Sequence, residues 1–248
     1  MYKRQDFISG FYERRIKRLV PALSVFVLTT GIAICLVNPG PDLSLRTGLT
    51  SMFGLSNLYL LKQSTDYFGQ ATELNVFTHT WSLGVEEQFY IIFPFLIWFT
   101  GFGRQTTNGA RNLLFTFGSL TIASLVGFLY LYQVNQPAAY FLMPTRFWEM
   151  ALGCLVFVGF KKRPSIKKFF EKIPTLLILT LIIGVMYLPN SLATTSTIAV
   201  VGLSMMLIAS LKKGTIGYQF FTNPIVVYIG LISYCLLYTS PSPRDVVP

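Results

Sequence analysis

The chain has 248 residues, of which 52% are hydrophobic and only 12% are charged, and its formal net charge is +10. Soluble proteins have roughly 25% charged residues, and here the apolar residues also come in long blocks, so an ordinary soluble domain is excluded. The composition predicts an all-α integral membrane protein, built as a polytopic bundle of transmembrane helices.

Seven apolar blocks are long enough, or nearly long enough, to cross a bilayer. They cover residues 19–37, 83–102, 113–132, 147–160, 176–188, 198–211 and 225–238. The shorter blocks reach the roughly 20 residues of a span by including flanking polar and aromatic residues at the headgroup level. We expect about seven spans. Segment 45–61, which contains Arg46 and several polar residues, is either a re-entrant or interfacial helix or an eighth crossing.

Basic residues gather on one side of this topology. If segment 45–61 does not cross, the Lys and Arg residues of segments 3–18, 104–111, 161–172 and 212–213 share one face. Only Arg46, Lys62 and Arg146 then lie on the other face, with Arg244 in the tail. The positive-inside rule makes the basic face cytoplasmic. The net charge is therefore a topology signal, and it predicts a multi-pass protein of the inner or plasma membrane whose partner is the lipid bilayer and not nucleic acid.

The three cysteines, Cys35, Cys154 and Cys235, all lie inside apolar blocks. Thiols in such blocks behave as small hydrophobic side chains, and their spacing fits no metal site and no disulfide framework. We expect neither a bound metal nor a disulfide.

The first functional candidate in chain order is the basic segment that precedes the first apolar block. Arg14 and Arg18 are four residues apart, so a helix places them on one face beside Tyr12, with Arg15 next to them. Two interpretations remain open. The segment is either a basic anchor at the surface of an anionic membrane, or an anion site in which guanidinium groups bind phosphate oxygens.

Segment 38–80 is the longest polar stretch and lies on the outer side of the predicted topology. Loops of this size inside a compact protein are usually functional or disordered. Its Asn-Leu-Tyr run at 57–59 and Asp-Tyr-Phe run at 66–68 mix aromatic rings with polar groups, as sugar-binding surfaces do. A lid or an acceptor-binding surface is one interpretation, and the aromatic belt of any membrane protein is the other.

The stretch that organises the chain runs from His79 to Tyr90, His-Thr-Trp-Ser-Leu-Gly-Val-Glu-Glu-Gln-Phe-Tyr. It contains the only histidine, next to an apolar block. On a helix Glu86 and Tyr90 share a face and Glu87 lies about 100 degrees away, so at least one carboxylate faces the bundle. A lone His79 is more typical of an interfacial imidazole than of a base, but its combination with Glu86, Glu87 and Gln88 favours a functional site. Pro94 is expected to kink this helix around a cavity.

A third charged group opens the fourth apolar block. Arg146 and Glu149 are three residues apart and can pair with each other, or Arg146 can reach Glu86 or Glu87 across the bundle, which is the pairing we favour. A structural salt bridge and a substrate contact both remain open. The blocks at 176–188 and 198–211 contain almost no ionisable groups and are expected to be scaffold.

Three sequence elements resemble the acyltransferase-3 superfamily of bacterial multi-span membrane enzymes, which O-acylate extracytoplasmic glycans. The run Phe-Tyr-Glu-Arg-Arg-Ile-Lys-Arg-Leu-Val-Pro at 11–21 is similar to the family's aromatic-Arg-Arg-x-x-Arg-x-x-Pro element. The run Thr-Trp-Ser-Leu-Gly-Val-Glu-Glu-Gln-Phe-Tyr at 80–90, with Pro94 after it, is close to the family's most recognisable motif. The run Arg-Phe-Trp-Glu at 146–149, followed by Gly153, is a looser match.

The resemblance implies an acyl-CoA donor, with acetyl-CoA as the expected one, at the cytoplasmic face, and it places Arg14, Arg15 and Arg18 near the phosphates of this co-substrate. No other cofactor is expected. The resemblance also implies a catalytic histidine on a first helical pair that would precede this chain. We therefore interpret residues 1–248 as a single acyltransferase-like domain, truncated at the N-terminus and also at the C-terminus and inactive alone, in which 1–5 and 235–248 are non-native ends.

These elements together predict acyl transfer from CoA to a hydroxyl of an extracytoplasmic polysaccharide or lipid-linked sugar. The catalytic candidates are His79, Glu86 and Glu87, with His79 and Glu86 expected to position the acceptor. The residues expected to bind the acceptor or to support the structure are Trp81, Ser82, Gln88, Tyr90, Arg146 and Glu149. The alternatives are a transporter or flippase for glycans or lipid-linked sugars, and a non-catalytic membrane homologue.

Overall fold

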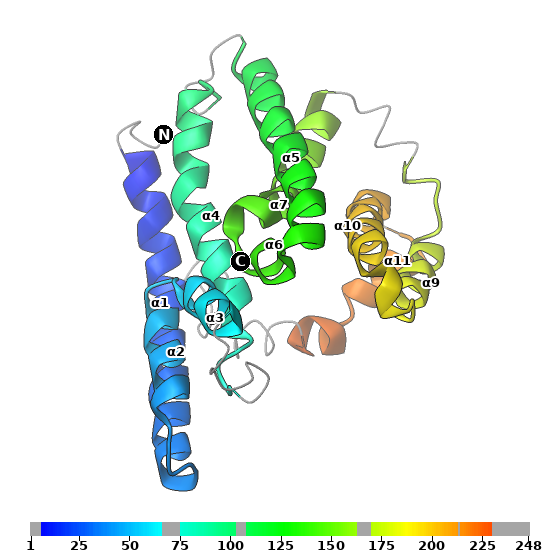
Figure 1. Cartoon of the computed structure of the whole chain (residues 1–248). Coiled ribbons are helices and arrows are strands. Elements are labelled where there is room, and N and C mark those ends of the chain that lie inside the picture. The colour runs from blue at the N-terminus through cyan, green and yellow to red at the C-terminus, as the bar shows by residue number, and fades with distance from the viewer. Residues whose placement is uncertain (1–5, 66–74, 103–107, 163–169, 213, 230–248) are drawn as a thin grey trace. The chain divides into compact units, whose positions relative to one another are not determined.

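The structure is a computed structural model that describes residues 6–65, 75–102, 108–162, 170–212 and 214–229, and these residues form helices and connections without a strand (Figure 1). The helices are α1 (Asp6–Val37), α2 (Asp42–Met52), α3 (Ser56–Thr65), α4 (Thr80–Phe99), α5 (Gly109–Val134), α6 (Gln136–Phe141), α7 (Met143–Lys162), α9 (Thr175–Met186), the 3₁₀ helix η2 (Asn190–Leu192), α10 (Ala193–Ser210) and α11 (Ile216–Phe221). The all-α membrane fold that the composition predicts is confirmed.

Four helical segments in the described part of the chain are long and apolar enough to cross a membrane. They are Ile8–Val37, Gly109–Val134, Gln136–Phe160 and Ala193–Ser210, and the shorter apolar helix Thr175–Met186 accompanies them. The predicted blocks at 19–37, 113–132, 147–160, 176–188 and 198–211 therefore all fall on apolar helices. The count of seven spans stays a prediction. Most of block 225–238, and the segments 1–5 and 235–248 that we interpret as non-native, lie outside the described residues.

The chain divides into two compact units. The first contains Met1–Leu96, Phe141–Met143 and Tyr228–Pro248, and the second contains Ile97–Tyr140 and Pro144–Val227. The first unit includes α1 to α3 and most of α4, and the second includes most of α5 to α11. The predicted polar motifs of segments 11–21 and 80–90 both fall in the first unit, while the Arg-Phe-Trp-Glu motif falls in the second.

In the first unit α1 is a rod of 32 residues, about 48 Å long, along which two other helices lie. Helix α2 packs on its C-terminal half, where a Cβ on Gly31 would lie 3.4 Å from Leu45 and one on Gly48 would lie 3.2 Å from Val27. Helix α4 lies along its N-terminal half, with Leu83 in one apolar cluster with Leu19 and Leu23. The glycines permit the close approach of α2 because they carry no side chain.

Segment 45–61 forms two short helices and not one continuous crossing. The chain turns at Gly54, whose φ of +66° is a left-handed conformation that favours glycine. The two helices, α2 and α3, have 11 and 10 residues, which is about 15 to 17 Å each and too short to cross a hydrocarbon layer of about 30 Å alone. Of the two interpretations of this segment, the geometry favours a re-entrant or interfacial segment over a single crossing.

In the second unit the core lies where α5, α6 and α7 meet. Phe128 and Trp148 pack together with Ala139, and all three side chains are buried. Ser124 on α5 donates a hydrogen bond to the Pro144 carbonyl and accepts one from the backbone N–H of Trp148 at 3.1 Å, so it joins α5 to the start of α7. Helices α9 and α10 pack against each other. As the sequence predicts, α10 carries no ionisable side chain, and neither does α9.

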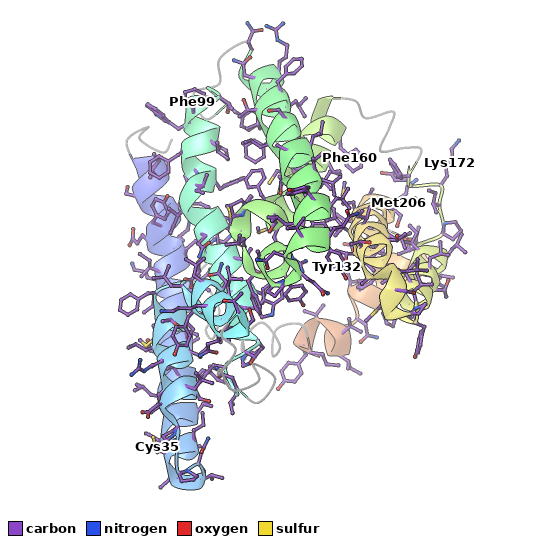
Figure 2. All side chains as sticks on the ribbon, in the orientation of Figure 1. Cys35, Phe99, Tyr132, Phe160, Lys172 and Met206 are labelled. Carbon is purple, nitrogen blue, oxygen red and sulfur yellow. The ribbon has the colours of Figure 1, made fainter. Side chains whose placement is uncertain are left out.

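The described residues contain neither a disulfide nor a cluster of side chains that could bind a metal ion. Cys35, near the C-terminal end of α1 in Figure 2, and Cys154 are free thiols, and Cys235 lies outside the described residues. No group of three or more His, Cys, Asp or Glu side chains that could hold a metal ion is present within the described ranges.

Candidate functional site

The arginine motif lies on the N-terminal half of α1, where its side chains point in more than one direction. Arg14 is exposed, while Arg15 and Arg18 are half-buried. The guanidinium carbon of Arg15 lies 4.0 Å from the centre of the Tyr90 ring and 5.6 Å from that of Phe11. This cation–π contact with Tyr90 holds the Arg15 side chain of α1 against α4. Of the three predicted donor-binding arginines, Arg15 is thus the one held between two helices.

A second contact joins the same helices next to Pro94. The Tyr12 hydroxyl donates a hydrogen bond of 2.6 Å to the carbonyl of Ile91, beside the Tyr90 carbonyl that Pro94 deprives of its helical donor. Phe11 adds ring contacts with Tyr90 and Phe93. The aromatic-Arg-Arg motif and the Glu-Glu-Gln-Phe-Tyr motif, which are about 75 residues apart in sequence, therefore form one contact region.

The other end of the α4 motif holds a buried polar network. Gln88 donates hydrogen bonds to the Gly54 carbonyl at 3.0 Å and to the Asn57 side chain at 2.9 Å. Asn57, which is completely buried, donates in turn to the Phe141 carbonyl at 2.9 Å. Ser56 donates to the Thr80 carbonyl at 2.7 Å. These bonds satisfy buried polar groups and fix the turn between α2 and α3 on α4.

Gly84 and Gly54 have specific roles in this network. A Cβ on Gly84 would lie 2.9 Å from the Asn57 side-chain oxygen and 3.1 Å from the Ser56 hydroxyl, so only glycine lets α3 begin so close to α4. The Glu87 side chain occupies the space where a Cβ on Gly54 would stand. Glu87 therefore lies against the left-handed turn, and the motif Gly-Val-Glu-Glu-Gln presents Gly84, Glu87 and Gln88 to the short helices α2 and α3.

His79 and its neighbours immediately precede the network. His79 is exposed and contacts the Phe26 ring edge-on, with ring centres 5.5 Å apart. Its carbonyl accepts a hydrogen bond of 3.3 Å from Ser82, and Trp81 makes an edge-on contact with Phe141. Glu86 is half-buried one residue before Glu87. The structure thus brings His79, Trp81, Ser82, Glu87, Gln88 and Tyr90 together on one helix and its N-terminus.

The contact with Phe26 also shows where His79 lies along the axis of α1. Phe26 is eleven residues from Val37 and eleven from Arg15, which is about 16 Å along the helix in each direction. His79 thus lies along α1 between the arginine motif and the C-terminal end of that helix, and its placement at the outer face of the membrane stays a prediction.

The Arg-Phe-Trp-Glu motif forms a separate cluster in the second unit. Arg146 pairs with Glu149 at 2.5 Å, and its guanidinium lies over the ring of Tyr140, 4.6 Å from the ring centre. Of the two predicted pairings of Arg146, the one with Glu149 on the same helix is therefore present. Pairing of Arg146 with Glu86 or Glu87 would join the two units and stays a prediction. Trp148 is buried and its indole N–H has no hydrogen-bond partner in the described part of the chain.

Sequence reasoning missed the residues that receive the motif. Asn57 was noted only as part of an aromatic outer segment, and Ser56 was not singled out. Gly54 was not singled out either, although an isolated glycine in a short apolar segment signals a break. Nothing in the local sequence indicates that Asn57 meets Gln88, because the two are 31 residues apart and lie on different helices.

Comparison with known proteins gives this geometry its context. A family profile described as an acyltransferase domain matches residues 1–239. The chain belongs to the acyltransferase-3 family. The match includes all three motifs, and therefore confirms the resemblance on which the sequence analysis relied.

Relatives of known sequence include proteins of Staphylococcus aureus. A protein of strain COL named as a candidate O-acetyltransferase, SACOL0978, is 28% identical over 243 residues, which are 92% of this chain and 40% of that protein. The O-acetyltransferase OatA of strain NCTC 8325 is 31% identical over 149 residues, 59% of this chain and 24% of OatA. The chain thus spans less than half the length of these relatives. No solved structure matches the chain significantly.

Proposed function

We propose that the protein is a multi-pass enzyme of a bacterial inner or plasma membrane that transfers an acetyl group from acetyl-CoA to a glycan. The donor would bind at the cytoplasmic side, and the acceptor would be a hydroxyl of an extracytoplasmic polysaccharide or lipid-linked sugar. Membership of the acyltransferase-3 family and similarity to proteins named as O-acetyltransferases support this proposal. The apolar helices that could cross a membrane support the location.

The arginine motif is the proposed donor site. Arg14 and Arg18 present guanidinium groups on one face of α1, and such groups bind phosphate oxygens in bidentate pairs. Arg15 stacks on Tyr90 and is the least free of the three to move. Its proposed role is to hold the site in place as well as to add positive charge. A CoA donor has its phosphates and its thioester at opposite ends of a flexible arm, so phosphate binding here leaves the thioester free to reach another part of the helix pair.

The acetyl-transfer reaction determines which chemical groups the rest of the site must provide. The acceptor hydroxyl oxygen forms the new ester bond, the thioester C–S bond breaks, and the hydroxyl proton passes by way of a base to the leaving sulfur. A general base and hydrogen-bond donors for the tetrahedral oxyanion are required. We assign His79 and Glu86 to positioning of the acceptor, with Trp81, Ser82 and Glu87 around them.

One observation carries the proposal. Helices α1 and α4 hold the arginine motif at one end of their contact, at Tyr90, and His79 at the other end, at Phe26. The two levels are about 16 Å apart along α1. This is the arrangement expected where a donor that arrives from the cytoplasm meets an acceptor that arrives from the other side.

The test is transfer of radiolabelled acetyl groups from acetyl-CoA to the glycan fraction. Acetyl-CoA is supplied at the cytoplasmic face of membrane vesicles that contain this chain joined to the N-terminal helical pair that the family resemblance implies. Replacement of Arg14, Arg15 and Arg18 by Gln should raise the KM for acetyl-CoA about tenfold or more, because charge-assisted hydrogen bonds to phosphate are lost. The exposed Arg111→Gln on α5 is the matched control and should leave KM unchanged.

The role of His79 has its own variant. His79→Ala should raise the KM for the acceptor and leave the KM for acetyl-CoA as it was. If the His79→Ala variant transfers acetyl groups as fast as the unaltered protein, His79 has no role in positioning the acceptor. Movement of labelled glycan across the membrane without any acetyl transfer would instead favour the transporter.

A further inference from the structure

An open cavity of about 340 Å³ lies in the first unit, outside the site described above. It is lined by Gly40, Asp42, Leu43, Arg46 and Tyr59. Gly40 precedes α2, and Asp42, Leu43 and Arg46 are on α2, while Tyr59 is on α3. Its volume falls in the range of about 300 to 1,000 Å³ that is typical of small-molecule sites. The cavity is thus large enough for a small ligand and is built from the two helices of the re-entrant segment.

Three polar side chains line this cavity, two of them exposed (Asp42 and Arg46) and one half-buried (Tyr59), and none pairs with another side chain of the described residues. Neither the carboxylate of Asp42 nor the guanidinium of Arg46 forms an ion pair with another described residue, although the two are four residues apart on α2. The Tyr59 hydroxyl likewise makes no hydrogen bond to the described part of the chain. A carboxylate accepts hydrogen bonds, a guanidinium donates them, and a phenol does both while its ring offers an apolar face.

This set of groups discriminates between ligand classes. A phosphate or other anion would be attracted by Arg46 but repelled by Asp42 in the same cavity. An apolar ligand would leave all three polar groups without partners when it excludes water, which is unfavourable. A sugar ring suits every member of the set, because its hydroxyls both donate and accept hydrogen bonds and its C–H face packs on an aromatic ring.

The position of the cavity fits this ligand. Its α2 residues lie near the C-terminal end of α1, since Leu45 faces Gly31 of that helix. That end is the outer one by the positive-inside rule, and Arg46 is one of the few basic residues that fall there. From the cavity α2 runs back along α1 and ends at the Gly54 turn, against which Glu87 lies.

We propose that the cavity formed by Asp42, Arg46 and Tyr59 is a saccharide subsite, which holds one sugar ring of the acceptor glycan at the outer side while another ring is acetylated. Tyr59 stacks on the ring, Arg46 donates to its oxygens and Asp42 accepts from its hydroxyls. The assignment to the acceptor rests on the proposed acetyltransferase function. The assignment of the sugar-binding chemistry rests only on the cavity and its lining.

The experiment is equilibrium binding of tetrasaccharides to the purified full chain in lipid nanodiscs, without any acyl donor. The probes are maltotetraose, chitotetraose and tetragalacturonate, which carry neutral, N-acetylated and acidic rings, and glycerol phosphate, which mimics a lipid headgroup. Saturation-transfer NMR detects binding, and calorimetry gives the dissociation constants. We expect at least one tetrasaccharide to bind and glycerol phosphate not to compete with it.

The variants are Tyr59→Ala, Arg46→Gln and Asp42→Asn. Each should weaken tetrasaccharide binding about tenfold or more, the range expected when a ring contact or a hydrogen bond to a charged group is lost. Lys62→Gln, an exposed change on α3 outside the cavity, is the matched control for Arg46→Gln. Tyr187→Ala, at a residue with 86% exposure in the second unit, is the control for Tyr59→Ala. Thermal unfolding of each variant separates loss of binding from loss of fold.

Three outcomes would overturn the proposal: no tetrasaccharide binds, the three variants bind as the unaltered chain does, or glycerol phosphate competes and binds more tightly to Asp42→Asn. The last outcome would make the cavity a lipid-headgroup site. Acetyl transfer, measured separately in vesicles that contain this chain joined to the implied N-terminal helical pair, distinguishes the two proposals. If acetyl transfer is intact but no tetrasaccharide binds, the saccharide subsite is contradicted and the proposed enzyme is not. If tetrasaccharide binding depends on Tyr59 but no acetyl group is transferred, the proposed enzyme is contradicted and a sugar-binding site remains.

Discussion

Both units of the molecule bury hydroxyl side chains, but within the described residues only the first unit also buries amide side chains. In the first unit the buried polar side chains include the amides of Asn57, Gln63 and Asn75. In the second unit the described buried polar side chains are all hydroxyls, those of Thr100, Thr121, Ser124, Thr145, Thr175 and Ser210. A helix hydroxyl can bond to a carbonyl of its own helix, whereas an amide has to find partners elsewhere.

This difference has a structural consequence. Thr121, for example, donates to the Phe117 carbonyl of its own helix, so this bond says nothing about the neighbouring helices. Asn57 instead bonds to Gln88 and to the Phe141 carbonyl, 31 and 84 residues away. Amide networks therefore specify one arrangement of segments, and the unit that has them is the unit in which the proposed acetylation site and saccharide subsite lie.

The substitution with the largest expected effect on the amide network is Asn57→Leu. The change removes the hydrogen bonds of Asn57 to Gln88 and to the Phe141 carbonyl, while Gln88 keeps its hydrogen bond to the Gly54 carbonyl. We expect the free energy of unfolding to fall by about 3 kcal/mol, the sum of two such losses. Equilibrium unfolding in mixed detergent measures it. A loss below about 1 kcal/mol would mean that the network contributes little to the fold.

Gly54→Ala is the next largest change. Alanine at a φ of +66° is strained by about 1 to 2 kcal/mol, and its Cβ would also meet the Glu87 side chain. We expect a loss of about 2 kcal/mol or more in the same unfolding assay. Combination with Glu87→Ala should recover the part due to contact and not the part due to the backbone, so the two effects should not add.

The control for this prediction is Gly118→Ala on α5. No atom lies within 4 Å of a Cβ built there, and the residue is helical, so alanine should be neutral or stabilise the protein by up to about 1 kcal/mol. Equal effects at Gly54 and Gly118 would contradict the specific role of the turn.

Arg15→Gln tests the contact between the two motifs. The cation–π contact with Tyr90 is worth about 1 kcal/mol in a half-buried site, and the expected loss of unfolding free energy is of that size. Arg15→Lys should retain part of it, because an ammonium still binds the ring face but lacks the planar stacking of a guanidinium. If Arg15→Gln unfolds like the unaltered protein, α1 and α4 are held by their apolar contacts alone.

The smallest effect is expected for Thr121→Val in the second unit. Valine has nearly the same shape, and the Phe117 carbonyl keeps its helical hydrogen bond when the hydroxyl is lost. We expect a change within about 0.5 kcal/mol. A loss comparable with that of Asn57→Leu would show that buried hydroxyls and amides are not as different as the two units suggest.

The sequence predicts the helices of this protein better than it predicts their partners. Length and hydropathy are properties of one segment, so the apolar helices were found at their expected places. The motif residues were also found, because their type and spacing are unusual. The missing part was the surface they contact: Gln88 meets Asn57, and Glu87 meets Gly54, through pairings between different helices that no local pattern encodes.

The contact that His79 makes with α1 was missed for a related reason. The hydropathy pattern places a residue relative to the start of its own apolar block, and it does not indicate which residue of another helix lies beside it. The structure shows that α4 begins beside the middle of α1 and not beside its end, as the contact between His79 and Phe26 demonstrates. Where a helix begins relative to its neighbours is decided by packing between segments.

The excess length of α1 also makes the protein sensitive to bilayer thickness. The helix is about 18 Å longer than a typical hydrocarbon layer, so it has to tilt or let one end protrude. Its C-terminal end carries Leu36 and Val37, both more than four-fifths exposed and suited to lipid, while the other end carries the arginines. If the apolar C-terminal end lies in the hydrocarbon, the excess length extends the arginine end beyond it. Lipids with longer acyl chains should then draw that end toward the headgroups, and shorter ones should leave it standing further out of the bilayer.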